Sequence, residues 1–94
     1  MKHKLNRLAR FSIAAATLRQ WPDLVRELMR GMIVLEARFD WALDSVCYLA
    51  DSSIFPENEP ALAAPEWFAN YRYEDCENGC CRELVELRLG PMPS

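Results

Sequence analysis

Histidine and glycine are scarce in this chain of 94 residues, and their scarcity excludes several kinds of chemistry. The one histidine is His3, near a terminus that is expected to fray, so no serine or cysteine has an evident base to activate it. The three glycines, Gly31, Gly79 and Gly90, are too far apart to form a phosphate-binding loop. Carboxylates are plentiful, but no two stand out as an acid–base pair. We therefore expect that the protein is not an enzyme and has no cofactor.

A long uninterrupted apolar run is also absent. Four charged residues break the most apolar stretch: Glu36, Arg38, Asp40 and Asp44. A membrane-spanning helix is therefore not expected. The first twenty residues are only weakly like a secretory signal, because their apolar run at 11–18 is short and is followed by Arg19. We expect a cytoplasmic protein that does not bind a membrane.

An excess of basic residues is missing as well, since the formal net charge is −3. Residues 1–30 carry seven Lys and Arg against two acids, whereas residues 31–94 carry four Arg against twelve acids. A nucleic-acid-binding protein is expected to be more basic, with aromatic residues among its cations. Nucleic acid is therefore not the favoured partner. A basic arm on an acidic body would instead steer a charged protein or a second copy of the chain.

Apolar residues, in contrast, are abundant, at 51% of the sequence. A chain of this length forms one domain, residues 1–94, and removes about 65% of its extended surface from water. Ten aromatic residues and four Met are a large supply for so small an interior. Part of the apolar surface is therefore expected to belong to an interface.

Residues 22–52 predict one long helix. Apolar residues recur there at alternating steps of three and four, as in a heptad seam. The seam consists of Val25, Leu28, Met32, Leu35, Phe39, Ala42, Val46 and Leu49. A continuous helix would span about 45 Å, more than the roughly 32 Å diameter of a compact domain of this size. Either Gly31 breaks the helix or a second molecule covers the remainder, and we expect the unbroken helix.

Two shorter helices are expected on either side of the long one. Residues 4–20 have helical spacing, although 11–17 would also suit a short strand. Trp21-Pro22 should separate this helix from the next, because proline disfavours the α region in the residue before it and suits the first helical turn. Residues 65–71 follow a proline-rich connector and predict a short capped helix with aromatic anchors.

The C-terminal part of the chain predicts a β-hairpin. Asn78-Gly79 is the strongest short hairpin signal, because a type I′ turn needs positive φ at both central residues. With these two residues as the loop, the facing pairs are Glu77 with Cys80, Cys76 with Cys81, Asp75 with Arg82, and Tyr73 with Leu84. The last two are a charge pair and an apolar pair, as cross-strand packing prefers. A helix that begins near Cys81 is the alternative.

The four cysteines are Cys47, Cys76, Cys80 and Cys81. Their spacing does not suit a structural zinc site, since adjacent cysteines rarely bind one ion and no second pair exists. A Cys76–Cys81 disulfide would fit the hairpin at a non-hydrogen-bonded pair. In a reducing cytoplasm we expect all four to remain thiols.

The predicted fold class is mainly α with a minor β part, with two to three helices around the long central helix and a small C-terminal β-hairpin. The patterns favour a small bacterial or phage regulatory protein that binds another protein. It would be a stoichiometric inhibitor or anti-activator of a transcription regulator or other host complex, and a homodimer through its long helix. The residues expected at the partner or dimer interface are Val25, Leu28, Met29, Met32, Ile33, Leu35, Phe39, Trp41, Leu43, Val46 and Tyr48.

Two other functions remain as alternatives. One is a nucleic-acid-binding module that places the basic N-terminal arm against phosphates. Its residues would be Lys2, Lys4, Arg7, Arg10 and Arg19. The other is a metal or redox sensor based on the cysteines.

Overall fold

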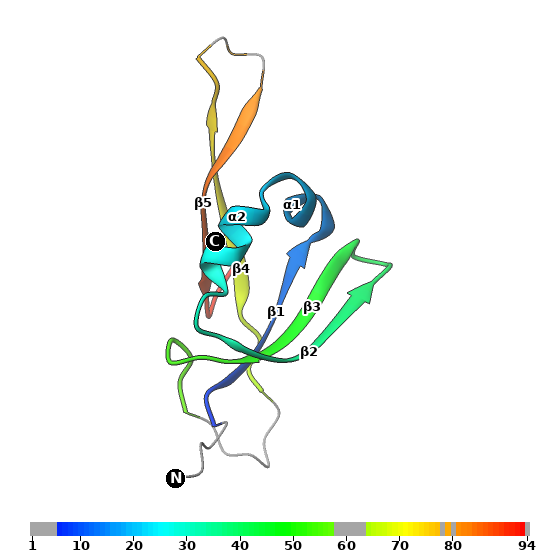
Figure 1. Ribbon diagram of the computed structural model, residues 1–94, viewed down its shortest axis with the longest axis vertical. Coiled ribbons are helices and arrows are strands. Elements are labelled where there is room, and N and C mark those ends of the chain that lie inside the picture. The colour runs from blue at the N-terminus through cyan, green and yellow to red at the C-terminus, as the bar shows by residue number, and fades with distance from the viewer. Residues whose placement is uncertain (1–5, 58–63, 78, 80, 94) are drawn as a thin grey trace.

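The computed structural model describes residues 6–57, 64–77, 79 and 81–93, and these residues form two antiparallel sheets and two short helices (Figure 1). The first sheet has the strand order β1-β3-β2, and the second pairs β4 with β5. The strands are β1 (Leu8–Ala14), β2 (Ile33–Asp40), β3 (Ser45–Asp51), β4 (Phe68–Asp75) and β5 (Arg82–Gly90). The helices are α1 (Ala15–Gln20) and α2 (Pro22–Leu28). The prediction of a mainly α fold around one long helix is therefore wrong.

The first predicted helix, over residues 4–20, is mostly a strand. Ala9, Phe11 and Ile13 are buried in β1, with the exposed Arg10 between the first two, so burial repeats every second residue as a half-buried strand requires. Only Ala15–Gln20 is helical. The strand reading of residues 11–17 was correct for the first part of that range.

The long helix predicted over residues 22–52 ends after two turns. It begins at Pro22, as the sequence indicates, and Asp23 lies in its first turn. It ends at Leu28, and Gly31 then adopts a φ of +81°, a left-handed conformation that an α-helix does not contain. The chain continues as the antiparallel pair β2–β3. No helix among the described residues is long and apolar enough to cross a membrane.

The short helix predicted at residues 65–71 is extended chain instead. The Arg10 N–H donates to the Pro65 carbonyl at 2.9 Å, and the Trp67 N–H donates to the Arg10 carbonyl at 2.7 Å. These bonds hold the segment alongside β1, on the side that does not face β3. The pairing keeps the segment extended, and β4 begins directly after it, at Phe68.

The predicted C-terminal hairpin is present. Asp75 faces Arg82 and Tyr73 faces Leu84, as the sequence indicates. The turn differs, because the Gly79 N–H donates to the Cys76 carbonyl at 2.8 Å, which starts the turn one residue earlier, at Cys76 instead of Glu77. Gly79 has a φ of +68°, whereas Asn78 and the predicted Cys80 pair lie outside the described residues.

Cys76 and Cys81 form a disulfide, so the expectation that all four cysteines remain thiols is wrong for this pair. The Cys76 N–H also donates to the Cys81 carbonyl at 3.0 Å. The pair is therefore joined by a backbone hydrogen bond, contrary to the non-hydrogen-bonded site that was expected. The hairpin extends well beyond the helices (Figure 1).

The hydrophobic core lies against one face of the first sheet, over β1 and β3. Its buried residues come from β1, β3, α2, β5 and the segment after β3: Ala9, Phe11, Ile13, Val25, Ala50, Phe55 and Leu87. Phe11 stacks on Tyr48 with the ring centroids 5.3 Å apart, and Phe55 packs edge-on against Trp67 at 4.9 Å. In Figure 1, α1, α2 and the β4–β5 hairpin lie on this side, while the C-terminal half of β2 lies farthest from them.

Candidate protein-binding surface

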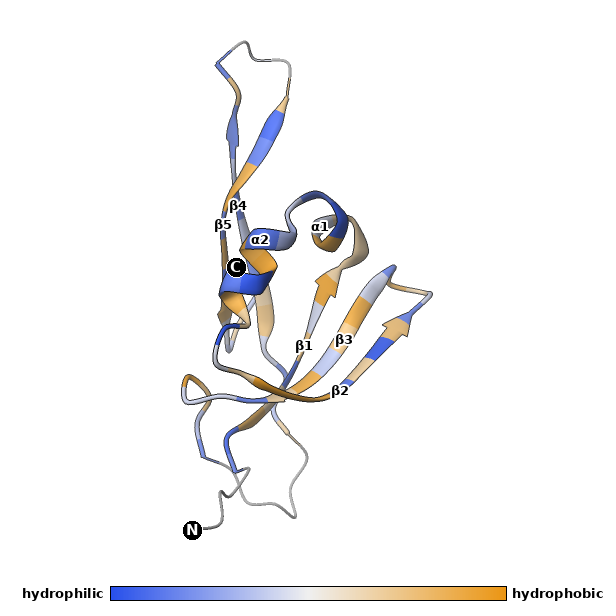
Figure 2. Cartoon of the chain, viewed as in Figure 1, coloured by the Kyte–Doolittle hydropathy of each residue, from blue (hydrophilic) through white to orange (hydrophobic). Residues whose placement is uncertain are grey.

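β2 is an outer strand of its sheet, and nearly its whole length is exposed. Apolar residues lie along β2 and β3, away from α2 and the hairpin (Figure 2). We define the β2 surface as the exposed apolar side chains of β2 and of the turn that follows it. These are Ile33, Val34, Leu35, Phe39, Trp41 and Leu43. Trp41 is 87% exposed and Leu43 is 64% exposed, so neither side chain belongs to the core.

The apolar face of the sheet continues past the elements that cover it. Ile13 of β1, Val46 of β3 and Phe39 of β2 are neighbours in one cross-strand row. Ile13 is completely buried, Val46 is half-buried and Phe39 is 38% exposed. A parallel row consists of Phe11, Tyr48 and Ala37. The core-facing side of the sheet is thus left open where it reaches β2.

The turn between β2 and β3 holds Trp41 beside this open face. One carboxylate oxygen of Asp40 accepts the N–H groups of Ala42 and Leu43 at 2.9 and 3.3 Å. Such a side-chain turn is typical of aspartate. Asp44 completes the reversal with a φ of +49°. The tight turn therefore presents Trp41 to solvent in a defined position.

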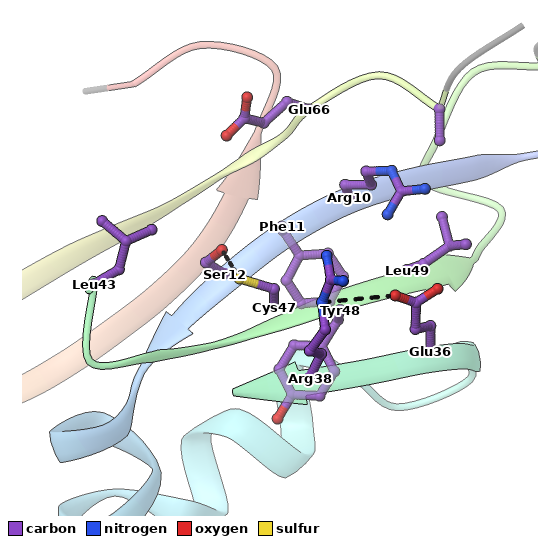
Figure 3. A pocket seen from close by; sticks show the side chains of 11 residues that line it. Arg10, Phe11, Ser12, Glu36, Arg38, Leu43, Cys47, Tyr48, Leu49 and Glu66 are labelled. Carbon is purple, nitrogen blue, oxygen red and sulfur yellow. Dashed lines mark hydrogen bonds and ion pairs between the residues drawn. The ribbon is translucent and has the colours of Figure 1, made fainter. Parts of the chain in front are cut away.

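The opposite face of the sheet carries an open groove of about 380 Å³ (Figure 3). Arg10 and Arg38 line it together with Glu36 and Glu66, so its charges are balanced. The Glu36 and Arg38 side chains form an ion pair at 3.9 Å. An anion or a cation would meet charges of both signs there, so the groove does not select either one.

The same groove contains one thiol, that of Cys47. The Ser12 hydroxyl donates to its sulfur at 3.2 Å. The one histidine and the two lysines of the chain lie at residues 2–4, outside the described residues. The described lining of the groove therefore contains no imidazole or amine that could act as a base for this thiol. The described groove therefore places no histidine or lysine beside the Cys47 thiol or the Ser12 hydroxyl.

The structure divides the predicted interface residues into three groups. Val25 is in the core, and Leu28, Met29 and Met32 pack against it. Ile33, Leu35, Phe39, Trp41 and Leu43 lie together on the β2 surface. Val46 and Tyr48 are half-buried on β3, and burial raises the pKa of the Tyr48 phenol. The structure therefore exposes five of the eleven residues along β2 and its turn. Phe39 and its ring partner Trp41 are on the core-facing side, whereas Ile33 is on the groove side and Leu43 lines the groove.

The prediction missed Val34, Glu36, Ala37 and Arg38, which become relevant because β2 is a strand. Val34 and Ala37 lie on the same side as Phe39, whereas Glu36 and Arg38 lie on the groove side, as their β3 neighbours show. A signal was present, since Gly31 precedes the β-branched pair Ile33-Val34, a combination that favours a break followed by a strand.

The residues of the basic arm have different environments. Lys2 and Lys4 lie outside the described residues. The Arg7 guanidinium pairs with Glu57 at 3.2 Å and donates to the Phe55 carbonyl at 2.9 Å, so it links β1 to the segment after β3. Arg10 lines the groove, and Arg19 is exposed on α1. Arg7 therefore has a structural role in the described fold.

The cysteines do not gather into one site. Cys76 and Cys81 are bonded at the end of the hairpin, whereas Cys47 is a free thiol on β3. Cys80 lies outside the described residues. Within the described part of the chain, no three His, Cys, Asp or Glu residues are grouped so that they could hold a metal ion.

Comparisons of the chain with protein-family models, with curated proteins and with solved structures gave no significant match. The function is therefore argued from the geometry of the chain alone. The strongest feature of that geometry is the β2 surface, because it exposes large apolar side chains on a defined backbone.

Proposed function

We propose that this protein is a small cytoplasmic regulator that acts by binding another protein through the β2 surface. The observation that supports this is the cross-strand row that runs from the buried Ile13 to the exposed Phe39. A core-facing side of a sheet that is left uncovered is a surface for another molecule. Each large apolar side chain buried by a partner contributes about 1.5–3 kcal/mol relative to exposure.

The types of residue on this surface also suit protein recognition. Tryptophan and other aromatic residues are enriched among the residues that dominate binding energy. Trp41 and Phe39 are in contact through their rings, with centroids 4.6 Å apart. An aromatic pair that is already ordered loses little side-chain entropy when a partner covers it. We take this pair as the anchor of the interaction.

The mode of action that we infer is occupancy. A protein of this kind works in a fixed ratio with its target, as an inhibitor or anti-activator of a transcription regulator or of another complex. Its β2 surface would cover an apolar face that the target uses for its own assembly. The acidic residues 31–94, which include β2, would favour a target with a basic rim.

The proposal is tested by photo-crosslinking in cells that produce the full chain. A photoreactive amino acid replaces Leu43 on the β2 surface or, as the control, Met92, an exposed apolar residue near the C-terminus. We expect a discrete adduct with another protein from position 43 and none from position 92. Trp41→Ala should remove that adduct, because it deletes the anchor. Equal labelling from both positions, or an adduct unaffected by Trp41→Ala, would contradict the proposal.

A further inference from the structure

The outer edge of β2 has no neighbouring strand among the described residues. The backbone groups that point outward follow from the hydrogen bonds of β3. The Ser52 N–H donates to the Arg7 carbonyl at 3.0 Å, and the Ala15 N–H donates to the Asp44 carbonyl at 2.9 Å. Hydrogen-bonded pairs alternate along an antiparallel ladder. The even-numbered residues of β3 therefore direct their backbone N–H and C=O groups toward β1, and the odd-numbered residues direct theirs toward β2.

The alternation fixes which residues of β2 are available at its outer edge. Cys47 and Leu49 direct their backbone groups toward their β2 neighbours, Arg38 and Glu36. Ala37 and Phe39 therefore direct their N–H and C=O groups away from β3. This edge is a template for one more antiparallel strand.

The sequence of β2 is complementary to itself in an antiparallel arrangement. With Ala37 opposite Ala37 of a second copy, Glu36 faces Arg38 and Leu35 faces Phe39, each pair occurring twice. Ala37 is then opposite Ala37 of the second copy, and Leu35 is opposite Phe39, so odd-numbered residues face odd-numbered residues. The backbone requires this, because Ala37 and Phe39 direct their N–H and C=O groups outward. The bulge between Val34 and Glu36 leaves Leu35 without a partner on β3, so its side chain can pack on the second copy.

From this complementarity we infer that β2 pairs with β2 of a second copy of this chain, about a two-fold axis at Ala37. The two three-stranded sheets then form one continuous sheet, joined through an interface that uses the same patch on both subunits. The inference rests on the proposed function, since it assigns a second occupant to the same surface. The second copy takes the backbone edge, and the apolar side chains of the two sheets remain side by side for the target.

Charge decides both the partner and the register. Charged residues on an edge strand often prevent pairing, but here the two charges have opposite signs and lie two residues apart. Sliding the second copy by two residues places Glu36 against Glu36, or Arg38 against Arg38, and like charges directly opposite one another are destabilising. Of these three arrangements, only the one centred on Ala37 satisfies both the charges and the backbone, so the edge is complementary to its own copy.

The test uses two charge-reversal variants of the full chain, Glu36→Arg and Arg38→Glu. Both side chains are exposed, so circular dichroism should show that each variant folds. Wild-type protein should have a solution mass near twice 10.9 kDa by light scattering at sufficient concentration. Each variant alone should dimerise at least about tenfold more weakly, because both cross-strand pairs become repulsive. An equimolar mixture should form a heterodimer in native mass spectrometry, since an edge with two arginines then meets an edge with two glutamates.

The mixture separates this pairing from effects within one chain. In each variant the Glu36–Arg38 ion pair of the single chain is replaced by like charges, and mixing cannot restore it. Recovery on mixing therefore reports only contacts between chains. Ala37→Pro gives a second test, because it removes an outward N–H without removing a bond to β3, and it should yield a folded monomer.

Three results would overturn the inference: wild-type protein that remains monomeric across the concentration range, variants that dimerise as well as wild type, or a mixture that forms no heterodimer. None of these depends on the target. A monomer that still gives the adduct from position 43 would overturn the pairing and leave the proposed function intact. A β2-paired dimer that gives no adduct with another protein would overturn the proposed function and leave the pairing intact.

Discussion

Trp41 packs edge-on against Phe39, with the ring planes at 70°, although Trp41 itself is almost entirely in water. The two residues lie on either side of Asp40, whose carboxylate caps the turn. An exposed tryptophan with one ordered aromatic neighbour contributes little to the fold that carries it. Its position is explained more readily by a partner than by the stability of the chain.

Trp41→Ala is therefore expected to separate stability from binding. The free energy of unfolding should fall by no more than about 1 kcal/mol, because only the aromatic pair is lost. Affinity for the target should fall by about 2 kcal/mol or more, roughly thirtyfold, if Trp41 is the anchor. Urea unfolding gives the first quantity, and titration against the target captured at position 43 gives the second. A large loss of stability would show that Trp41 is covered by its own chain.

Phe39→Ala measures how far the core-facing side of the sheet is open. Phe39 is partly exposed, so its truncation should cost about 1–2 kcal/mol, less than the ring of a fully buried phenylalanine. Phe11→Ala is the matched control in the same sheet, and it should cost about 3–5 kcal/mol because Phe11 is 2% exposed. Both values come from urea unfolding of dilute protein. Equal losses would mean that β2 is covered as completely as β1.

Gly31→Ala should change the stability of the protein in opposite directions in the predicted continuous helix and in the observed fold. In a continuous helix over 22–52, replacing this glycine with alanine would stabilise the protein by about 1 kcal/mol. In the observed fold Gly31 has a φ of +81°, so alanine should destabilise it by about 1 kcal/mol. No atom lies near an added Cβ, so the effect would come from the backbone alone. Gly31→Asn is the control, because asparagine tolerates this conformation better. A rise in melting temperature for Gly31→Ala would contradict the turn.

Local signals in the sequence predicted those parts of the fold that depend on neighbouring residues. Asn78-Gly79 indicated the hairpin, and the register of Asp75 with Arg82 followed from counting outward. Pro22 likewise marked the start of α2. Each of these features is determined within a few residues, so the sequence was sufficient for them.

The remaining fold depends on pairing between distant segments. β1 pairs with β3 across more than thirty residues, and no local pattern reports that contact. Within residues 33–40 the bulge at Leu35 interrupts the two-residue repeat of a strand, and the shifted apolar residues then match steps of three and four. Gly31 favours the turn over a continuous helix, because glycine readily adopts the positive φ that it has there.

This explains why the candidate surface was only partly predicted. Five of the residues expected on a helix face lie together on the β2 surface because they are neighbours in sequence, in residues 33–43. The others lie on α2, in the segment that follows it or on β3. Glu36 and Arg38 had no role in a helical seam, and their complementarity appears only when residues 36 and 38 can face each other across two strands.

Tyr48 should make the stability of the protein sensitive to alkaline pH. Burial raises its pKa in the folded protein above the ordinary value of 10.0, whereas the unfolded chain keeps that value. The stability contributed by the neutral phenol is therefore complete below pH 10.0 and is lost as the pH rises through the folded pKa. Urea unfolding between about pH 9 and pH 11 should show a fall that is smaller for Tyr48→Phe. Equal falls in both proteins would mean that Tyr48 ionises freely in the fold.

The Cys76–Cys81 disulfide should stabilise the hairpin without being required for the fold. It closes a loop of about six residues, and the chain-entropy relation gives about 2 kcal/mol for a loop of that length. The core residues belong to other parts of the chain, apart from Leu87 of β5. The register next to the disulfide also has support of its own, from the Asp75–Arg82 ion pair at 3.5 Å and from the Arg82 guanidinium 5.9 Å from the centre of the Tyr73 ring.

Reduction should accordingly lower the melting temperature and leave a cooperative transition. The double variant Cys76→Ser with Cys81→Ser should melt near the reduced wild-type protein and should not respond to reductant. Cys47→Ser is the matched control, because it removes a thiol outside the bond and should keep the response. Alkylation followed by mass spectrometry should find two additional reactive thiols after reduction. If the same number reacts before reduction, or if the reduced protein loses its cooperative transition, the disulfide does not have this role.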